Sequence, residues 1–252
     1  MLRKLSILLV CLFAVESLPA QQPQIDATEL ISKADAKRRG KSSTGAMTMT
    51  VERPGWSRTV ALKTWTLGTD YSLILITAPA KEKGQAFLKR KNEMWSFVPS
   101  IDRIIKMPSS MMGQSWMGSD FTNDDLLKES SFTKDYHHRV LGSEDLAIGP
   151  CWKVEMVPLE NAAVVWGKLL VWVTKKDDNF VKIERYDEDG EMISTEICDA
   201  IRMVDDREIP THMVMTPGDK PGNHTSLTID TMDFDSPLSE AFFSQQNMKR
   251  VR

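Results

Sequence analysis

The sequence has few of the side chains on which catalysis most often depends. It contains four histidines in 252 residues, and two of them, His137 and His138, are adjacent. Adjacent residues of a strand point to opposite faces, so this pair cannot readily hold one metal ion. The sequence also lacks a metal-ligand spacing pattern, a glycine-rich phosphate loop and a serine in the setting of a nucleophile elbow. We therefore expect no catalytic residue, no metal site and no cofactor.

An excess of positive charge is absent as well. The chain has 32 basic and 35 acidic side chains, which gives a formal net charge of −3. Its two short basic clusters, residues 37–39 and 89–91, are typical of solvated faces or turn edges. Because a nucleic-acid-binding domain usually carries a basic patch, we expect no nucleic-acid partner.

Long apolar runs are missing outside the first twenty residues. That segment begins with two basic residues, continues with an apolar run over residues 7–15, and ends in the small-residue site Leu18–Ala20. This is the pattern of a secretory signal peptide. The run is shorter than the roughly 20 residues that a membrane-spanning helix needs. The sequence predicts a signal peptide over residues 1–20, cleaved after Ala20, and an exported domain over residues 21–252 without a membrane span.

Cysteine is scarce. Of the three cysteines, Cys11 precedes the predicted cleavage site, which leaves Cys151 and Cys198. An oxidising compartment permits a disulfide between them. Each falls on the polar phase of its strand, which predicts that both lie on the outer surface of the sheet. The sequence leaves their pairing open, because it does not give the distance between their Cα atoms.

The exported part indicates one helix followed by many strands. Asp26 and Glu29 form a capping-box pattern, and apolar residues recur at helical spacing from Ile25 until Gly40 ends the helix. From Met47 the period changes from 3.6 to 2, with turn residues between successive runs. The predicted strands cover residues 47–52, 57–67, 71–77, 85–89, 93–98, 102–107, 136–141, 151–158, 168–174, 180–186, 192–201, 208–216 and 224–232. Short helical turns are predicted within residues 124–128 and 239–247.

This many short strands joined by tight turns indicate a mainly β (α+β) fold, either an antiparallel barrel or a sandwich. The composition does not change along the exported part, and no linker or fixed repeat interrupts it, so we expect a single domain. The largest insertion between strands lies at mid-chain. A loop longer than the usual few residues is more often functional.

This insertion, residues 108–131, combines large apolar side chains with many glycines and serines. Its large apolar residues are Met111, Met112, Trp116, Met117 and Phe121. Methionine adapts to irregular apolar partners, and tryptophan supplies a broad flat face. The segment contains too much Gly and Ser for an ordinary core strand. We therefore expect these five residues to form or edge a lid over an apolar cavity, with ordinary core packing as the alternative.

Candidates for the wall of such a cavity lie on the strands. The chain has fifteen methionines and seven tryptophans. A filled core normally favours Val, Ile and Leu, whereas methionine suits surfaces that accept varied partners. Met47, Met49, Trp65 and Trp95 are the predicted wall residues. Alternation along a strand separates its two faces but does not say which face is inside.

Several motifs resemble the outer-membrane lipoprotein-sorting protein family, a branch of the LolA-like superfamily of periplasmic lipoprotein carriers. The most specific motif is Pro108–Met112 followed by Ser115–Phe121 and Asp124–Leu126. The other matching stretches are Met47–Val51, Ala78–Gly84, Lys91–Trp95, Ile209–Thr211 and Phe242–Asn247.

The resemblance implies a fold and a role. The fold is an incompletely closed antiparallel β-barrel, with an N-terminal helix and a mid-chain helical lid over an apolar cavity. The role is that of a periplasmic carrier that shields the acyl chains of a lipoprotein or lipid during transfer toward the outer membrane. An inner-membrane transporter and an outer-membrane acceptor are the partners that such a role implies.

Two other functions stay open at this stage. The first is a non-enzymatic interaction module, or an accessory protein of an inner-membrane lipid exporter of the resistance-nodulation-division type. In that case the Met- and Trp-rich insertion is an exposed docking patch, as large apolar patches often are. The second is a lipid hydrolase, which would need an arrangement of Ser, His and acid that the sequence does not contain.

Overall fold

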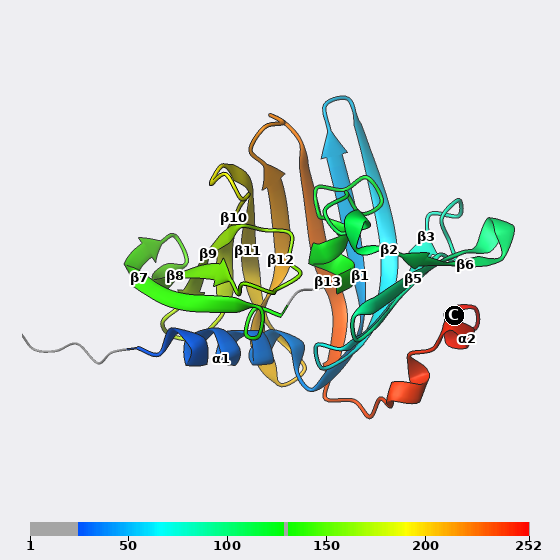
Figure 1. The fold of residues 1–252 in the computed structure, drawn as a ribbon, viewed down its shortest axis with the longest axis horizontal. Helices are drawn as coiled ribbons and strands as arrows, with labels where there is room; N and C mark the ends of the chain where they lie inside the picture. Colours follow the sequence, from blue (N-terminus) through cyan, green and yellow to red (C-terminus); the bar gives the residue numbers. More distant parts are fainter. Residues whose placement is uncertain (1–24, 129–130, 252) are drawn as a thin grey trace, which may run out of the picture.

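The computed structural model describes residues 25–128 and 131–251, so the predicted signal peptide lies outside the described residues. One curved antiparallel sheet of 13 strands forms most of the molecule (Figure 1). In chain order the strands are β1 (Ser42–Arg53), β2 (Trp56–Leu67), β3 (Tyr71–Ala78), β4 (Ala86–Arg90), β5 (Glu93–Val98), β6 (Arg103–Met107), β7 (Tyr136–Leu146), β8 (Gly149–Pro158), β9 (Lys168–Thr174), β10 (Phe180–Tyr186), β11 (Met192–Val204), β12 (Arg207–Pro217) and β13 (His224–Phe234). The helices are α1 (Ala27–Arg39) and α2 (Gln245–Met248), with short turns η1 (Pro99–Ile101), η2 (Ser109–Met111), η3 (Asp124–Lys128) and η4 (Glu240–Phe242).

The order of the strands in the sheet determines where the mid-chain segment lies. The order is β6-β5-β4-β3-β2-β1-β13-β12-β11-β10-β9-β8-β7. The chain enters at the middle with β1, moves outward to the edge strand β6, and then continues at the opposite edge with β7. From there it returns strand by strand to β13, which pairs with β1. The segment between β6 and β7 must therefore pass from one edge of the sheet to the other.

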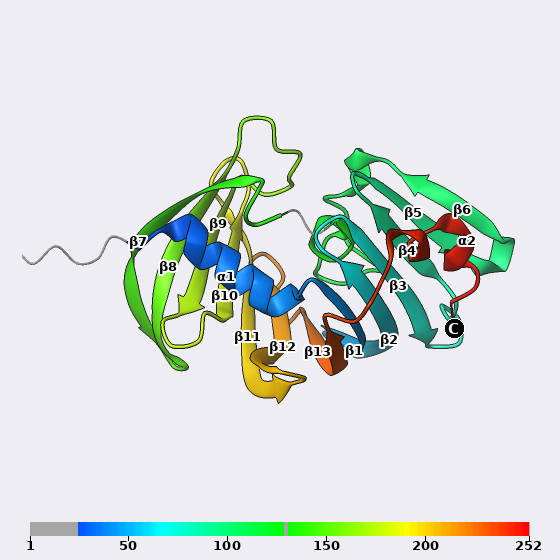
Figure 2. The same cartoon turned by 90° about the horizontal axis from the view of Figure 1, so that it is seen from below.

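We call this connection the crossover segment, residues 108–128 and 131–135. It passes over the concave side of the sheet (Figures 1 and 2). Its buried apolar side chains pack against the inward side chains of β1, β2 and β3 and against Met215 of β12 and Leu227 of β13. Farther along, Phe132 packs with α1 and the inward side chains of β7 to β10. The concave face is thus covered by the crossover segment over one half and by α1 over the other (Figure 2).

Helix α1 begins and ends where the sequence predicts. The Asp26 carboxylate accepts hydrogen bonds from the backbone N–H groups of Thr28 (2.8 Å) and Glu29 (3.1 Å), which caps the first turn. Glu29 does not complete the capping box and instead pairs with Lys33 at 2.7 Å. At the other end Gly40 has φ of 67°, a conformation that glycine adopts without strain, and its N–H bonds to the carbonyl of Ala36.

Strand β3 is buried on both sides, which explains its continuous apolar sequence. Ile74 and Ile76 face the concave side and join the cluster under the crossover segment. Leu73 and Leu75 face the convex side, where they pack against Phe243 and the residues of α2. The C-terminal segment therefore covers β3, β4 and β5 from outside (Figure 2).

The 13 predicted strands are all present, and most boundaries agree within two residues. Three strands extend more than two residues beyond the prediction, namely β1, β7 and β11, which ends at Val204. β1 begins at Ser42 because its first residues pair with both neighbours in spite of their serine- and glycine-rich sequence. β7 continues to Leu146 because a register shift between Val140 and Gly142 lets the ladder resume beyond the glycine. The sheet is not closed, because β6 and β7 form its two edges.

The prediction that both cysteines lie on the outer surface is wrong. Cys151 and Cys198 are buried and both are free thiols. Cys151 packs on the convex side in a small apolar cluster with Trp172 and Val181. The polar residues that share its phase on the strand do not indicate this cluster. Cys198 lies on the concave face, where its Sγ is 3.7 Å from Glu196. The two residues are three strands apart, about 14 Å, and on opposite faces, so no disulfide joins them.

Candidate functional site: an apolar cavity under the crossover segment

The concave face holds a partly open cavity of about 180 Å³ between the sheet, α1 and the crossover segment. Most of its lining side chains are apolar and come from strands at both sides of the β1–β13 junction. The apolar lining residues are Met47, Leu62, Ile74, Trp116, Phe121, Leu126, Phe132, Tyr136, Trp166, Leu169, Ile183, Met213, Leu227, Ile229 and Met232. The other lining residues are polar or charged: Arg38, Arg39, Ser43, Thr64, Thr66, Ser72, Asp124, Asp125, Arg185 and Glu196.

The structure brings together all five predicted residues of the crossover segment. Met112, Trp116 and Phe121 are buried in one apolar cluster, and Met111 and Met117 pack against it partly exposed. Of the five, Trp116 and Phe121 line the cavity. The segment therefore closes the concave side with its largest side chains pointing inward.

The four predicted wall residues divide between the two faces of the sheet. Met47 lines the cavity, and Met49 is fully buried in the cluster beside it. Trp65 and Trp95 lie on the convex face in the cluster under the C-terminal segment, where the Trp65 ring is 5.7 Å from that of Phe242. These two tryptophans do not line the cavity.

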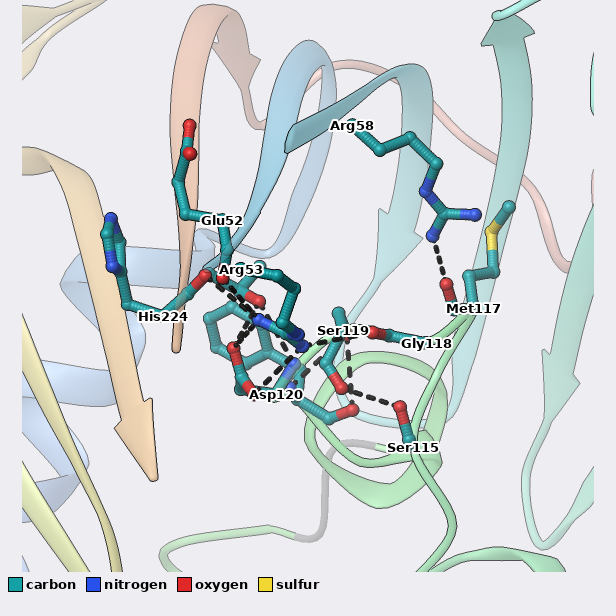
Figure 3. A network of polar contacts seen from close by, with 11 residues as sticks. Glu52, Arg53, Arg58, Ser115, Met117, Gly118, Ser119, Asp120 and His224 are labelled. Carbon is teal, nitrogen blue, oxygen red and sulfur yellow. Dashed lines mark hydrogen bonds and ion pairs between the residues drawn. The ribbon is translucent and has the colours of Figure 1, made fainter. Parts of the chain in front are cut away.

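Arg53 ties the crossover segment to the end of β1 (Figure 3). Its Nη1 and Nη2 atoms donate to the two carboxylate oxygens of Asp120 at 2.8 and 3.0 Å. Nη2 also donates to the carbonyl of Gly118 at 3.1 Å. From β13, the Thr225 hydroxyl donates to Asp120 at 2.6 Å. Both side chains of the ion pair are mostly buried. Burial favours this bidentate contact over contacts of the two charges with water.

A second arginine holds the same turn from β2. Arg58 donates to the carbonyl of Met117 (Figure 3). Its other terminal nitrogen lies 3.0 Å from Glu82. Met117 has φ of 50°, a left-handed conformation that is uncommon for a residue with a side chain. The contacts of Arg58 and Arg53 together hold this turn in place.

The third attachment is a buried group of three charges. Arg185 of β10 donates to Asp125 of the crossover segment at 3.1 Å and to Glu196 of β11 at 2.5 Å. The three side chains are 6 to 7% exposed. Burial alone would lower the pKa of Arg185, but the charges of Asp125 and Glu196 outweigh burial and raise it. The arginine is therefore permanently charged and needs both carboxylates.

The sequence reading missed this group. Arg185 shares its phase with Ile183, which lines the cavity, so a cation at an inward position was the available signal. Glu196 lies on the next strand, but Asp125 is 60 residues away in sequence, and nothing local connects it to Arg185. Within residues 25–128 and 131–251, no cluster of three His, Cys, Asp or Glu side chains could hold a metal ion.

Comparison with known families identifies the family of the chain. A model of a family described as "Uncharacterized protein" matches residues 68–250, well over half of the chain. The chain belongs to this family. A search of curated proteins found no match.

Three solved structures resemble the chain over nearly its whole length. A proposed outer membrane lipoprotein-sorting protein domain from Vibrio parahaemolyticus has a TM-score of 0.79 at 24% identity, covering 89% of this chain and 98% of that one. A DUF1329 family protein from Desulfovibrio piger has a TM-score of 0.79 at 21% identity, covering 88% and 97%. A LolA superfamily protein from Nitrosomonas europaea has a TM-score of 0.77 at 24% identity, covering 88% and 99%. The chain thus has the LolA superfamily fold, as the resemblance predicts.

The helices of the described part are short. Apart from α1 with 13 residues, each has five residues or fewer. None of them is long and apolar enough to span a bilayer.

Proposed function

We propose that this protein is a periplasmic carrier that shields the acyl chains of a lipoprotein or lipid in the cavity under the crossover segment. The observation that carries the proposal is the cavity itself, lined by methionine, leucine, isoleucine and aromatic side chains and covered by a Met- and Trp-rich segment. Each methylene group removed from water contributes about 0.8 kcal/mol. An acylated cargo therefore needs an apolar enclosure to cross an aqueous compartment.

The size of the cavity implies a movable cover. At about 180 Å³ it is close to a cavity of roughly 150 Å³ that holds benzene, and below the range of roughly 300–1,000 Å³ typical of ligand pockets. A long acyl chain needs more room than this, which an outward movement of part of the wall would supply. The crossover segment is the natural moving part, because it has little regular structure and rests on the sheet through apolar packing and the polar contacts of three arginines.

In this proposal the crossover segment is a lid. Trp116 and Phe121 are its inner surface, Met111, Met112 and Met117 are its edge, and Met47 belongs to the facing wall, with Met49 packed beside the cavity. Methionine side chains change shape at low cost, so the lid and the wall can repack around cargo of different lengths. The proposal includes no catalytic residue, because the cavity needs only to enclose its ligand.

The location and partners follow from the same role. The predicted signal peptide would send the chain to the periplasm, where a carrier would receive cargo from an inner-membrane transporter and deliver it to an outer-membrane acceptor. Service to an inner-membrane lipid exporter is compatible with the same cavity. The docking-patch alternative is less well supported, because Trp116 is 1% exposed and Phe121 is also buried.

Native mass spectrometry of the protein purified from a periplasmic fraction tests the proposal. We expect an added mass that extracts as a lipid or an acylated peptide. As a second arm, fatty acids should compete for the cavity with a dye that fluoresces in enclosed apolar sites. A clean mass that stays clean after incubation with lipids and lipoproteins, together with weak and nonsaturating dye displacement, would contradict the carrier function.

A further inference from the structure

Two buried N–H groups of the cavity lining have no hydrogen-bond acceptor. They are the indole Nε1–H of Trp116 and the Nε–H of Arg38, and both residues line the cavity. A buried donor that loses its hydrogen bond to water destabilises the protein unless another acceptor replaces the water. Most buried polar groups in proteins have such a partner, so each exception asks for an explanation.

Trp116 is fixed by its surroundings. Its backbone N–H donates to the carbonyl of Phe121 at 2.8 Å, and the neighbouring Ser115 forms an isolated bridge with Thr122. The indole ring meets the ring of Phe87 edge-on, with the ring centroids 5.4 Å apart. A phenylalanine would supply the same kind of apolar contact without an unpaired donor. Packing therefore leaves the indole N–H without an acceptor, as it does for Arg58 Nε and Asn179 Nδ2 away from the cavity.

Arg38 approaches the cavity from the end of α1. Its Nη2 donates to Asp35 at 3.1 Å, and its guanidinium carbon lies 5.5 Å from the ring centroid of Phe132 and 5.7 Å from that of Phe180. These contacts occupy the terminal nitrogen and the face of the group. They leave Nε without an acceptor.

Several other polar groups of the lining have partners within it. Arg185 is satisfied by Asp125 and Glu196, and the hydroxyls of Ser43 and Thr66 are 2.6 Å apart. Among the described residues, the buried acceptor without a partner is Glu82 Oε2, and Glu82 does not line the cavity. The two unpaired N–H groups, on Trp116 and Arg38, are covered by protein atoms in this structure, so a ligand reaches them only when the lining moves.

We infer that the ligand of this cavity carries a hydrogen-bond acceptor into the apolar interior, and that it is an acyl ester or amide whose carbonyl oxygen accepts from Trp116. This inference rests on the proposed carrier function and narrows its cargo. An acyl chain attached through a carbonyl satisfies the indole, whereas a plain hydrocarbon or an alkyl ether leaves the indole unpaired or poorly paired. Trp116 is accordingly a specificity-determining residue for acylated over alkylated lipids.

A matched pair of lipids tests the inference. The probes are 1-palmitoylglycerol and 1-O-hexadecylglycerol, which have the same chain length and glycerol head but differ in the ester carbonyl. Their affinities are measured by displacement of a fluorescent apolar dye, below the concentration at which either lipid aggregates. We expect the protein to bind the ester about tenfold more tightly than the ether, the scale of one buried hydrogen bond.

Two variants assign that preference to the indole. In Trp116→Phe we expect the ester preference to fall to about onefold, while the affinity for the ether changes by less than about twofold. Trp65→Phe is the matched control, because it makes the same change on the convex face beside Phe242. That variant should keep the full ester preference. Thermal unfolding followed by circular dichroism establishes that both variants are folded.

The possible outcomes distinguish the preference for an ester from the carrier function on which it rests. Equal affinity of the unmodified protein for ester and ether, or an ester preference that survives in Trp116→Phe, would overturn the inference and leave the carrier function standing. Failure of both lipids to displace the dye would overturn the inference and the carrier function. Loss of the preference in Trp116→Phe alone would support both.

Discussion

Arg185 and Asp125 form a buried ion pair, 3.1 Å between Nε and Oδ1, that joins the crossover segment to the C-terminal end of β10. The second oxygen of Asp125 accepts hydrogen bonds from the backbone N–H and the hydroxyl of Thr122, at 2.8 and 2.7 Å. The indole N–H of Trp166 donates to the oxygen that faces Arg185, at 3.3 Å. Both carboxylate oxygens of Asp125 thus have partners. Its buried negative charge is compensated by Arg185 at one side of the cavity.

Replacing Arg185 by methionine should strongly destabilise the protein. The change keeps much of the apolar length of the side chain but leaves Asp125 and Glu196 as buried carboxylates without their cation. Breaking a buried pair in this way costs roughly 3–5 kcal/mol of unfolding free energy. Urea denaturation measures the loss. Arg139→Met is the control, because Arg139 is 71% exposed and its pair with Glu155 should contribute less than about 1 kcal/mol. Equal losses in the two variants would contradict the role of Arg185.

Loosening the Arg53–Asp120 contact should speed release of the ligand. Asp120→Asn keeps the shape of the side chain and removes the charge that the two nitrogens of Arg53 share. We expect release of a bound fluorescent fatty acid to become about tenfold faster in stopped-flow displacement. Asp230→Asn is the control, since Asp230 is exposed and accepts a hydrogen bond from Thr48 away from the lid. Unchanged release in Asp120→Asn would mean that this contact does not hold the lid.

A disulfide between the lid and β13 should block loading. Asp120 and Thr225 contact each other through side chain and backbone, so cysteines at these two positions lie at a distance that a disulfide can bridge. The oxidised double variant should take up no fluorescent fatty acid, and reduction should restore uptake. Without the two substitutions, reductant should have no effect, because Cys151 and Cys198 are free and buried. Normal uptake by the oxidised variant would show that the lid does not have to move.

The ion pairs of Asp35 with Arg39 and Arg38 should make the free energy of unfolding depend on pH at low pH. Burial alone would raise the pKa of Asp35, but the two arginines outweigh burial and lower it below its ordinary 3.8. A carboxyl whose pKa is lower in the folded state stabilises the protein above the unfolded pKa and loses this contribution as pH falls through the folded pKa.

Asp35→Asn should therefore destabilise the protein by about 1–3 kcal/mol at pH 7, and the difference from the unmodified protein should shrink below pH 4. Urea denaturation at several pH values measures it. Asp102→Asn serves as the control, because Asp102 forms an exposed pair with Lys249. A difference that stays constant from pH 7 to pH 3 would rule out the charge of Asp35 as the cause.

The elements of this fold are predictable from sequence because their boundaries depend on neighbouring residues. Asp26 and Gly40 cap α1 locally, and turn residues separate the strands. The faces of the strands are harder to predict, since Met47 and Trp65 look equally apolar and only the assembled sheet puts one in the cavity and the other under the C-terminal segment.

The polar part of the site lies beyond local patterns for the same reason. Arg185 and Glu196 read as exposed residues because a charge usually faces solvent. Their burial depends on Asp125, which the crossover segment brings from another part of the chain. The prediction for Cys198 is wrong for the same reason, because Cys198 points to the same inward face as Glu196.

The pairing of β1 with β13 has a consequence for how the molecule is assembled. On each side of this junction, strands follow one another as hairpins that can form early, whereas the junction itself joins Ser43 to Phe234. Contacts between such distant residues form slowly, because a long loop must close first. A fragment that ends before residue 224 would contain nearly all of both hairpin series and the whole lid, yet the strand that joins them would be missing. Enclosure of a ligand is therefore the last property that the growing chain acquires.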